Sequence, residues 1–175
     1  MSHSHYKTKP RSRKDLRMFA YILRQALGYS DLARLDIVRV LEHDLVKVFG
    51  DDFEYEVVEV DEMEEYAICL PDLCKIIIRE DVYVEAAKGY VRHRFTIAHE
   101  IGHLFLHHDV KKLARIGGKL PDLKVFENPE WQANEFAGEF LAPSHLIGNL
   151  SVEEIATTFN VSKQVAIKRY NNVRK

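Results

Sequence analysis

The sequence predicts an α+β fold, in which helices surround a small three-stranded antiparallel sheet. Apolar residues recur at helical spacing along most of the chain, and they alternate with polar residues only between positions 53 and 79. Helices before and after one short run of strands are typical of the α+β class. With 175 residues, of which 46% are hydrophobic, the chain is long enough for one domain with its own core.

Two amphipathic helices are expected before the strands. Ser12 and Asp15 have the spacing of a capping box, and Gly28 suits the residue that follows a helix end. A second helical pattern begins at Asp36 and ends at Gly50. The buried face expected for this second helix carries Ile37, Val40, Leu41, Leu45 and Val48.

Three short strands are expected next, with a turn at Pro71 and Asp72 between the last two. In the first strand apolar residues alternate with glutamates, which predicts one wet, acidic face. The expected strand ranges are 53–57, 66–70 and 75–79.

Helices are again expected in the second half of the chain. Asn128 is a good N-cap residue and Pro129 suits the first helical position, so a helix should run from there to about position 141. Ser151 begins another capping box, and Asn160 separates the last two helical segments. The other expected elements are helices at 81–87 and 91–107, followed by a surface connection at 109–127.

Charge is segregated along the chain, although the net charge is only -2. Residues 1–24 carry seven basic side chains and one acidic side chain, whereas residues 51–65 carry nine acidic side chains and no basic one. The small net charge argues against a protein that coats nucleic acid by bulk electrostatics. No apolar run approaches the roughly 18 residues of a transmembrane helix. Because Cys69 and Cys74 fit no disulfide framework, we expect reduced thiols in a cytoplasmic protein.

Residues 99–103 read His-Glu-Ile-Gly-His, in the middle of an expected helix. Side chains four positions apart lie on one helix face, so the imidazoles of His99 and His103 can reach one metal ion. Glu100 would point to the open side of that ion, where a carboxylate can act as a general base. Zinc suits imidazole, and a catalytic zinc takes three protein ligands and keeps one position for solvent.

The third ligand has to come from elsewhere in the chain. Glu130 is the strongest candidate, because it lies in the first turn of the next helix. Asn134, one turn later, can hold a ligating histidine in the required tautomer. Spacing alone leaves Glu127, Glu135 and Glu139 open as competitors.

Two further residues near the motif are possible ligands, His107 and Asp109. His107 lies on the same helix face as His99 but roughly 12 Å along the helix from it, so a supporting or packing role is expected. Asp109 has the spacing of the third ligand in another zinc-protease pattern. That pattern needs a glycine where this chain has Leu106, which disfavours Asp109.

Residues 94–108, which contain the His-Glu-Ile-Gly-His motif, and residues 130–143 form two blocks. Together these blocks resemble the ImmA/IrrE family of metallopeptidases, which have a minimal zincin-like fold. The resemblance implies that His99, His103 and Glu130 bind zinc and that Glu100 is the catalytic acid and base. Family members cleave helix-turn-helix repressors of mobile elements or stress regulons, which implies such a repressor as partner and substrate.

We therefore expect a zinc-dependent endopeptidase, and manganese or cobalt would suit a similar site. The substrate is expected to add as a strand to an edge of the sheet, with residues 75–79 as that edge. Tyr90, His93 and His107 are candidates to stabilise the oxyanion, and the sequence does not choose among them.

Residues 155–170 allow a different interpretation, because they read like a helix-turn-helix with basic residues in its second helix. The protein would then be a DNA-binding transcriptional regulator with a structural or vestigial metal site. A hairpin packed on the core is favoured, because one module with five basic and two acidic side chains in its last 25 residues binds DNA weakly. The expected organisation is a basic amino-terminal extension with an amphipathic helix (1–34), a zincin-like core (35–150) and this hairpin (151–175). The sequence predicts no oligomeric state.

Overall fold

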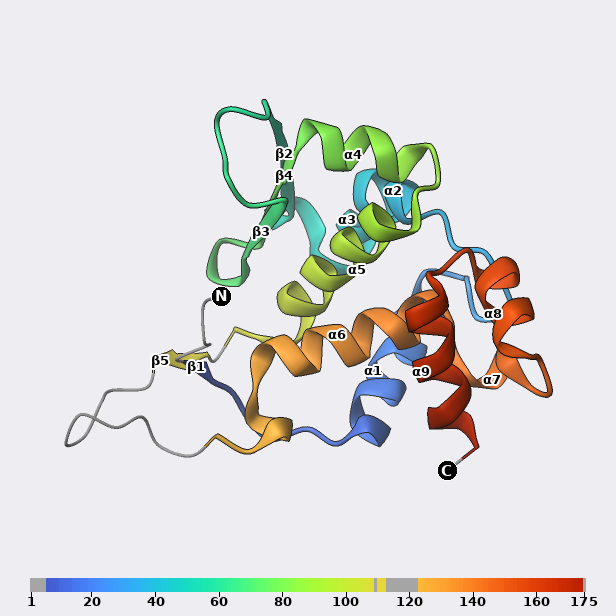
Figure 1. Ribbon diagram of the computed structural model, residues 1–175. Coiled ribbons are helices and arrows are strands. Elements are labelled where there is room, and N and C mark those ends of the chain that lie inside the picture. Colours follow the sequence, from blue (N-terminus) through green and yellow to red (C-terminus); the bar gives the residue numbers. More distant parts are fainter. Residues whose placement is uncertain (1–5, 109, 113–122, 175) are drawn as a thin grey trace.

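A computed structural model describes residues 6–108, 110–112 and 123–174, and has the predicted α+β architecture. Figure 1 shows α5 and α6 side by side across the middle of the molecule, with the larger sheet at one end and α7 to α9 at the other. The helices are α1 (Arg13–Ala26), α2 (Ile37–Arg39), α3 (Leu45–Phe49), α4 (Glu80–Ala87), α5 (Val91–Leu106), α6 (Pro129–Leu141), α7 (Ser144–Ile147), α8 (Val152–Phe159) and α9 (Lys163–Val173). The strands are β1 (Tyr6–Lys7), β2 (Glu54–Val58), β3 (Ala67–Leu70), β4 (Lys75–Arg79) and β5 (Lys111–Lys112).

The larger sheet is mixed, so the prediction of an antiparallel sheet was wrong in this detail. Its strand order is β2-β4-β3, with β2 parallel and β3 antiparallel to β4. A short turn joins β3 to β4, which forces a hairpin, whereas β2 lies on the other side of β4. Strand β4 is therefore central, and the expectation that residues 75–79 form an edge was also wrong. The edges of this sheet are β2 and β3.

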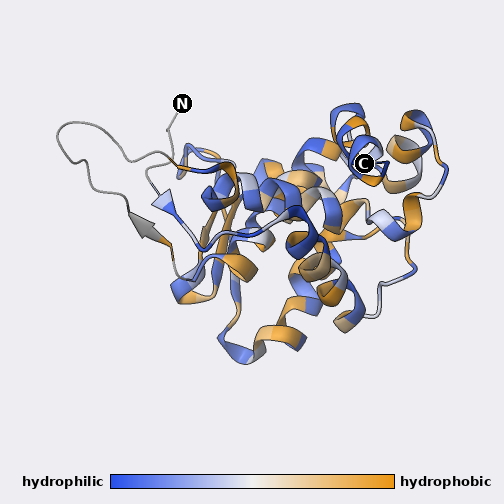
Figure 2. Ribbon diagram, turned by 90° about the horizontal axis from the view of Figure 1, so that it is seen from below, coloured by the Kyte–Doolittle hydropathy of each residue, from blue (hydrophilic) through white to orange (hydrophobic). Residues whose placement is uncertain are grey.

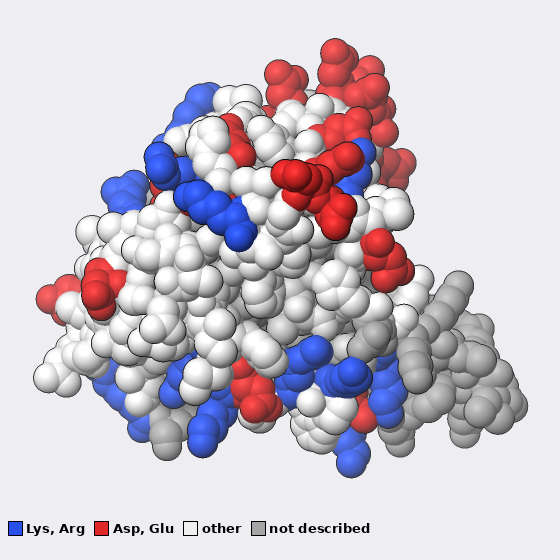
Figure 3. Space-filling view, turned by 180° about the vertical axis from the view of Figure 1, so that it is seen from behind, with Lys and Arg blue, Asp and Glu red and all other residues white. Residues whose placement is uncertain are grey.

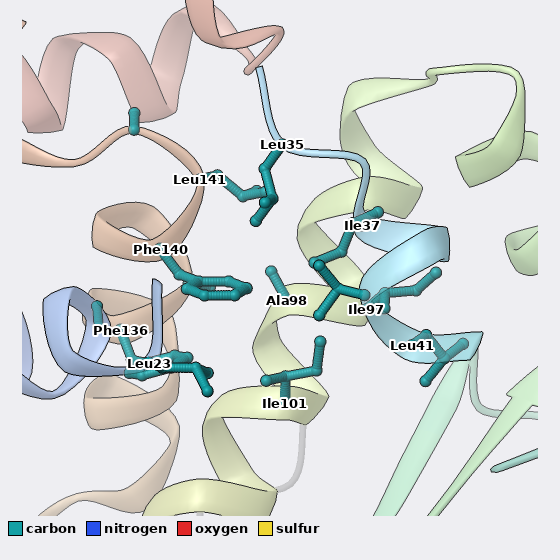
Figure 4. Packing of buried hydrophobic residues seen from close by; sticks show 14 of the residues in the cluster. Leu23, Leu35, Ile37, Leu41, Ile97, Ala98, Ile101, Phe136, Phe140 and Leu141 are labelled. Carbon is teal, nitrogen blue, oxygen red and sulfur yellow. The ribbon is translucent and has the colours of Figure 1, made fainter. Parts of the chain in front are cut away.

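Helices α5 and α6 approach closely because α5 has a glycine at the contact. A Cβ added to Gly102 would lie 3.0 Å from the Phe136 ring and 3.3 Å from the backbone of Ala133. Figure 4 shows the core that forms around this contact, with Ala98 of α5 toward Phe140 of α6 and Ile97 of α5 on the other side, toward Leu41. Leu23, Leu35, Ile37 and Leu41 join them from other parts of the chain.

The expected helix at 36–50 is divided by a π-helical turn at Val40–Asp44. The wider turn shifts the helix face by roughly one residue, and the inward face changes accordingly. Asp44 is buried, where its carboxylate accepts from the Tyr29 hydroxyl at 2.6 Å, while Val48 is 37% exposed. The prediction that Val48 packs inward was therefore wrong, whereas Ile37, Val40, Leu41 and Leu45 are fully buried.

The predicted helix ends were confirmed where a local cap determines them. Ser12 and Ser151 form capping boxes with residues three positions later, and the Asn128 side chain accepts from the N–H groups of Glu130 and Trp131. Asn160 adopts the left-handed conformation between α8 and α9, as a helix end requires. Most of the expected connection at 109–127 lies outside the described residues.

The two terminal segments share contacts with the central helices. Helix α1 packs on α6, and Ile155, Phe159 and Ala166 of the last two helices belong to the same apolar core. Apolar residues line the inward sides of the helices in Figure 2, while hydrophilic residues lie outside. The division at positions 34 and 150 stays a prediction.

Charged side chains are separated in space as well as in sequence. Figure 3 shows acidic side chains gathered at the end that carries the larger sheet, and basic side chains along the lower edge and at the upper left. In the described part of the chain, no helix combines the length and the apolar character needed to span a membrane.

Candidate metal centre

Helix α5 presents the two histidines of the motif on the side away from its apolar face. Ile97, Ala98 and Ile101 are fully buried in the core, so the helix cannot turn about its axis. The side chains of His99 and His103 are 16% and 15% exposed, on the side that faces the start of α6. Their Nε2 atoms are 2.9 Å apart.

Helix α6 brings Glu130 to these imidazoles. Asn128 caps the helix and Pro129 occupies its first position, which places Glu130 in the first turn. The carboxylate oxygens of Glu130 lie 3.3 Å from Nε2 of His99 and 3.4 Å from Nε2 of His103. Within the described parts of the chain, these three residues are the one group of His, Cys, Asp or Glu whose ligand atoms all lie within 4.8 Å of one another.

The outer nitrogen of each histidine is also bonded. Nδ1 of His99 lies 3.1 Å from Oδ1 of Asn134, one turn after Glu130 on α6. Nδ1 of His103 lies 2.9 Å from Nδ1 of His107, which is 3% exposed. Burial, followed by the neighbouring His103, lowers the pKa of His107 to about 3, so this imidazole is neutral.

The donor set fits a divalent cation. When Nδ1 carries the hydrogen, Nε2 presents a lone pair, so two imidazole lone pairs and a carboxylate face one point. Burial disfavours a charged His99, but its bond to Glu130 and the charge of Glu100 outweigh burial and raise the pKa of His99. The contacts with His103 and His99 lower the pKa of Glu130. Both shifts reflect the closeness of this carboxylate to the two imidazoles.

Glu100 lies beside this group and is 9% exposed. Burial raises the pKa of its carboxyl group, against the opposing charges of His99 and His103. The backbone of Cys69 in β3 acts in the same direction as these charges and lowers the pKa of Glu100. Strand β3 therefore lies next to Glu100.

The competing carboxylates have other partners. Glu127 pairs with Lys7 at 2.8 Å, and Glu135 pairs with Lys168 at 2.9 Å and with Arg13 at 3.4 Å. Glu139 is buried against Arg169 and accepts from the N–H of Ser144 at 2.7 Å. None of these three reaches the histidines, and Asp109 lies outside the described residues.

The candidates for oxyanion stabilisation are not gathered at this site. Tyr90, the N-cap residue of α5, and His93 precede His99 by nine and six residues, which is about 14 Å and about 9 Å along the helix. His107 uses both of its ring nitrogens in hydrogen bonds.

Sequence reasoning missed two groups near the site, Gln132 and the backbone of Cys69. Gln132 lies two residues after Glu130, so helical spacing does not place it on the same face. Both depend on contacts between distant segments, and no local pattern signals them.

Comparison with known proteins identifies a family for this chain. A comparison with curated proteins gives no match to the chain. The model of the IrrE N-terminal-like domain, a peptidase family, matches residues 46–171, which include all of α5 and α6 and the predicted ligands. The match extends over more than half of the chain, and the chain therefore belongs to the family of the IrrE N-terminal-like domain, as the resemblance to the ImmA/IrrE metallopeptidases predicted.

Proposed function

We propose that this protein is a zinc-dependent endopeptidase that hydrolyses a peptide bond in a helix-turn-helix repressor. The family supports a metallopeptidase acting on a protein. The observation that carries the proposal is the convergence of His99, His103 and Glu130 beside the buried Glu100. The free thiols of Cys69 and Cys74 are consistent with a cytoplasmic location.

The catalytic roles follow from the positions of the side chains. His99, His103 and Glu130 would hold the cation, which supplies a Lewis acid for the scissile carbonyl and makes water more acidic. Glu100 would accept the proton of the attacking water on its carboxylate and deliver it to the leaving amine. Asn134 and His107 would keep the two ligating imidazoles in place by bonding their Nδ1 atoms.

An extended substrate segment is proposed to lie along β3. Among the described residues this strand pairs with β4 alone, and the backbone of its Cys69 lies next to Glu100. A peptide that added to this edge would place its carbonyl groups within reach of the site. The edge thus replaces residues 75–79 as the proposed substrate path.

A second surface adjoins the site on α6. A cavity of about 730 Å³ begins at Asn134 and Trp131 and extends past Phe95 to Val165 and Lys168 of α9. Its largely apolar lining would suit an apolar side chain of the substrate. We propose that this cavity binds a substrate residue that lies outside the scissile bond.

The DNA-binding alternative is not favoured by the contacts of α9. A recognition helix needs free basic side chains, but Arg169 is buried against Glu139 and Lys168 pairs with Glu135. Lys163 lies 3.6 Å from Glu153. The hairpin is therefore proposed to complete the core and the adjoining cavity.

The test is to incubate the protein with candidate helix-turn-helix repressors, with and without a chelator. We expect cleavage that stops when the cation is removed and returns when zinc is restored. Glu100→Gln should lower the rate by roughly 10²–10⁴-fold, because it removes the proton acceptor. Cleavage that persists at the same rate in Glu100→Gln would contradict the assignment of the base. DNA binding that survives chelation, without any cleavage, would instead support the regulator.

A further inference from the structure

The amino-terminal segment 8–11, called here the N-terminal strap, is bonded to the start of α6. The N–H of Thr8 donates to the carbonyl of Glu127, and the N–H of Arg11 donates to the carbonyl of Phe126, each at 3.0 Å. Thr8 is 4% exposed, so this part of the strap is buried. In Figure 1 the chain runs from β1 past the start of α6 into α1. The strap lies outside residues 46–171, to which the family model extends.

Gln132 connects the strap to the interior. Its Nε2 atom donates to the carbonyl of Lys9 at 2.8 Å and to that of Phe126 at 2.7 Å. Because both amide hydrogens are directed to carbonyl oxygens, the amide orientation is determined. Its Oε1 atom then faces Nη1 of Arg11 at 3.0 Å and Nε2 of His107 at 3.2 Å.

This orientation determines which nitrogen of His107 carries hydrogen. The carbonyl oxygen of Gln132 can only accept, so Nε2 of His107 is the donor. His107 is buried, and no carboxylate is among its hydrogen-bonding partners, which keeps its ring neutral and leaves a lone pair on Nδ1. Nδ1 of His103 must then donate to it, across 2.9 Å.

The tautomer of His103 determines the state of the proposed ligand atom, Nε2. With hydrogen on Nδ1, the neutral ring of His103 has its lone pair on Nε2, which faces Glu130 and His99. His99 is supported differently, by the single contact with Asn134 on the adjacent helix. His103 is thus connected to the strap through two residues, His107 and Gln132.

We propose that the N-terminal strap supports the cation site. Through Gln132 and His107, the strap holds His103 in the tautomer whose Nε2 binds the cation. This inference rests on the proposed cation site at His99, His103 and Glu130. Gln132 and His107 are positioning residues, since they act through His103. Displacement of the strap, by a partner or by cleavage, would weaken cation binding without touching a ligand.

The first experiment measures zinc affinity of the full chain by competition with a chromophoric chelator. Gln132→Leu removes the acceptor of His107 and the anchor of the strap, and we expect roughly 10–100-fold weaker binding. Arg11→Met, which removes the contact of the strap with Oε1 of Gln132 but keeps the acceptor of His107, should weaken binding in the same direction and by less. Lys7→Met is the matched control, because it removes the ion pair with Glu127 but leaves Gln132 bonded, and its affinity should equal that of the wild type. Unchanged affinity in a folded Gln132→Leu would overturn the proposal.

The second experiment separates this role from general support of the fold. In protein with ¹⁵N-labelled histidine and no added cation, two-bond nitrogen–proton correlations report which ring nitrogen carries hydrogen. We expect His107 as the Nε2–H form in the wild type and a mixture of forms in Gln132→Leu. A wild-type His107 with hydrogen on Nδ1 alone would refute the proposal. This result does not depend on peptidase activity, so a protein with the expected tautomer that cleaves no repressor would contradict only the proposed function.

Discussion

Helix α6 carries carboxylates on two sides, and the difference between their partners separates the candidate site from the scaffold. Glu130 faces two imidazoles, and its side chain is 54% exposed. Glu135 and Glu139, on the side toward α1 and α9, are 4% and 6% exposed and face Arg13, Arg17, Lys168 and Arg169. A carboxylate among permanent cations is already neutralised, whereas one that faces imidazole lone pairs still needs a positive centre.

The comparison also explains the segregated charge of the sequence. Arg13 and Arg17 come from the basic amino-terminal segment, and Lys168 and Arg169 come from the basic end of the chain. Arg24 of α1, which is fully buried, donates to the carbonyl of Phe140 in α6 at 2.7 Å. These basic residues therefore hold α1 and α9 against α6, and a nucleic-acid partner is not needed to account for them.

The largest expected effect on stability is on the scaffold side of α6. Arg169→Met removes the nearer of the two cations that face the buried Glu139, and it removes donors to the carbonyl of Ala142 and the Ser144 hydroxyl. We expect the free energy of unfolding of the metal-free protein to fall by about 3–5 kcal/mol, as for other broken buried ion pairs. Urea denaturation with a chelator present measures the loss.

The matched control is Lys163→Met, which breaks a pair with Glu153 whose side chains are 73% and 74% exposed. It should cost less than about 1 kcal/mol. Equal losses in the two variants would show that burial does not distinguish these ion pairs.

On the site side, the largest expected effect is on cation affinity. Glu130→Ala removes a proposed ligand, so affinity should fall by more than the roughly 100-fold that marks the upper range for supporting residues. The metal-free variant should unfold at nearly the wild-type urea concentration, because the side chain is half exposed. Glu127→Gln, which alters a carboxylate that spacing alone left open, should bind the cation like the wild type. If only Glu127→Gln lost affinity, Glu127 and not Glu130 would be the ligand.

A smaller effect is expected from the support of His99. Asn134→Ala removes the acceptor of its Nδ1–H group, and we expect roughly 10–100-fold weaker cation binding by chelator competition. Asn134→Asp keeps an acceptor oxygen and adds negative charge, so it should bind at least as tightly as the wild type. Equal affinity in Asn134→Ala and wild type would show that His99 needs no support from α6.

Much of the fold and the common helix face of the two histidines could be predicted because the deciding interactions are local. Ser12, Asn128 and Ser151 cap helices through residues within three positions, and the spacing of His99 and His103 guarantees one helix face. The parallel pairing of β2 with β4 could not be read in the same way, because strand order depends on contacts between distant segments.

The misassigned and missed residues have equally specific causes. Val48 was misassigned because a π-helical turn changes the helical phase within one apparently regular pattern. Gln132 was missed because its importance arises from the strap, more than 120 positions earlier in the chain. Such contacts follow from the tertiary structure and leave no periodic signal in the sequence.

The smallest expected effect tests whether α1 contributes to the scaffold without altering the site. Ser12 follows the strap and caps α1: its hydroxyl accepts from the N–H of Asp15 at 3.2 Å, and the Asp15 carboxylate accepts from the N–H of Ser12 at 2.8 Å. Ser12→Ala should lower the free energy of unfolding by about 1 kcal/mol at neutral pH, and Thr157→Ala, which removes another exposed hydroxyl, by less than about 0.5 kcal/mol.

The pH dependence of the Ser12→Ala effect has a definite sign. Hydrogen bonds from Ser12 lower the pKa of Asp15, so the stabilisation is complete above the unfolded-state pKa and is lost as pH falls through the folded-state value. The difference between wild type and Ser12→Ala in urea denaturation should therefore narrow in acid. Cation affinity should stay at the wild-type value, because the cap contacts neither Gln132 nor His107. A tenfold loss of affinity in Ser12→Ala would mean that α1 is coupled to the site, and the two sides of α6 would then have to be treated as one unit.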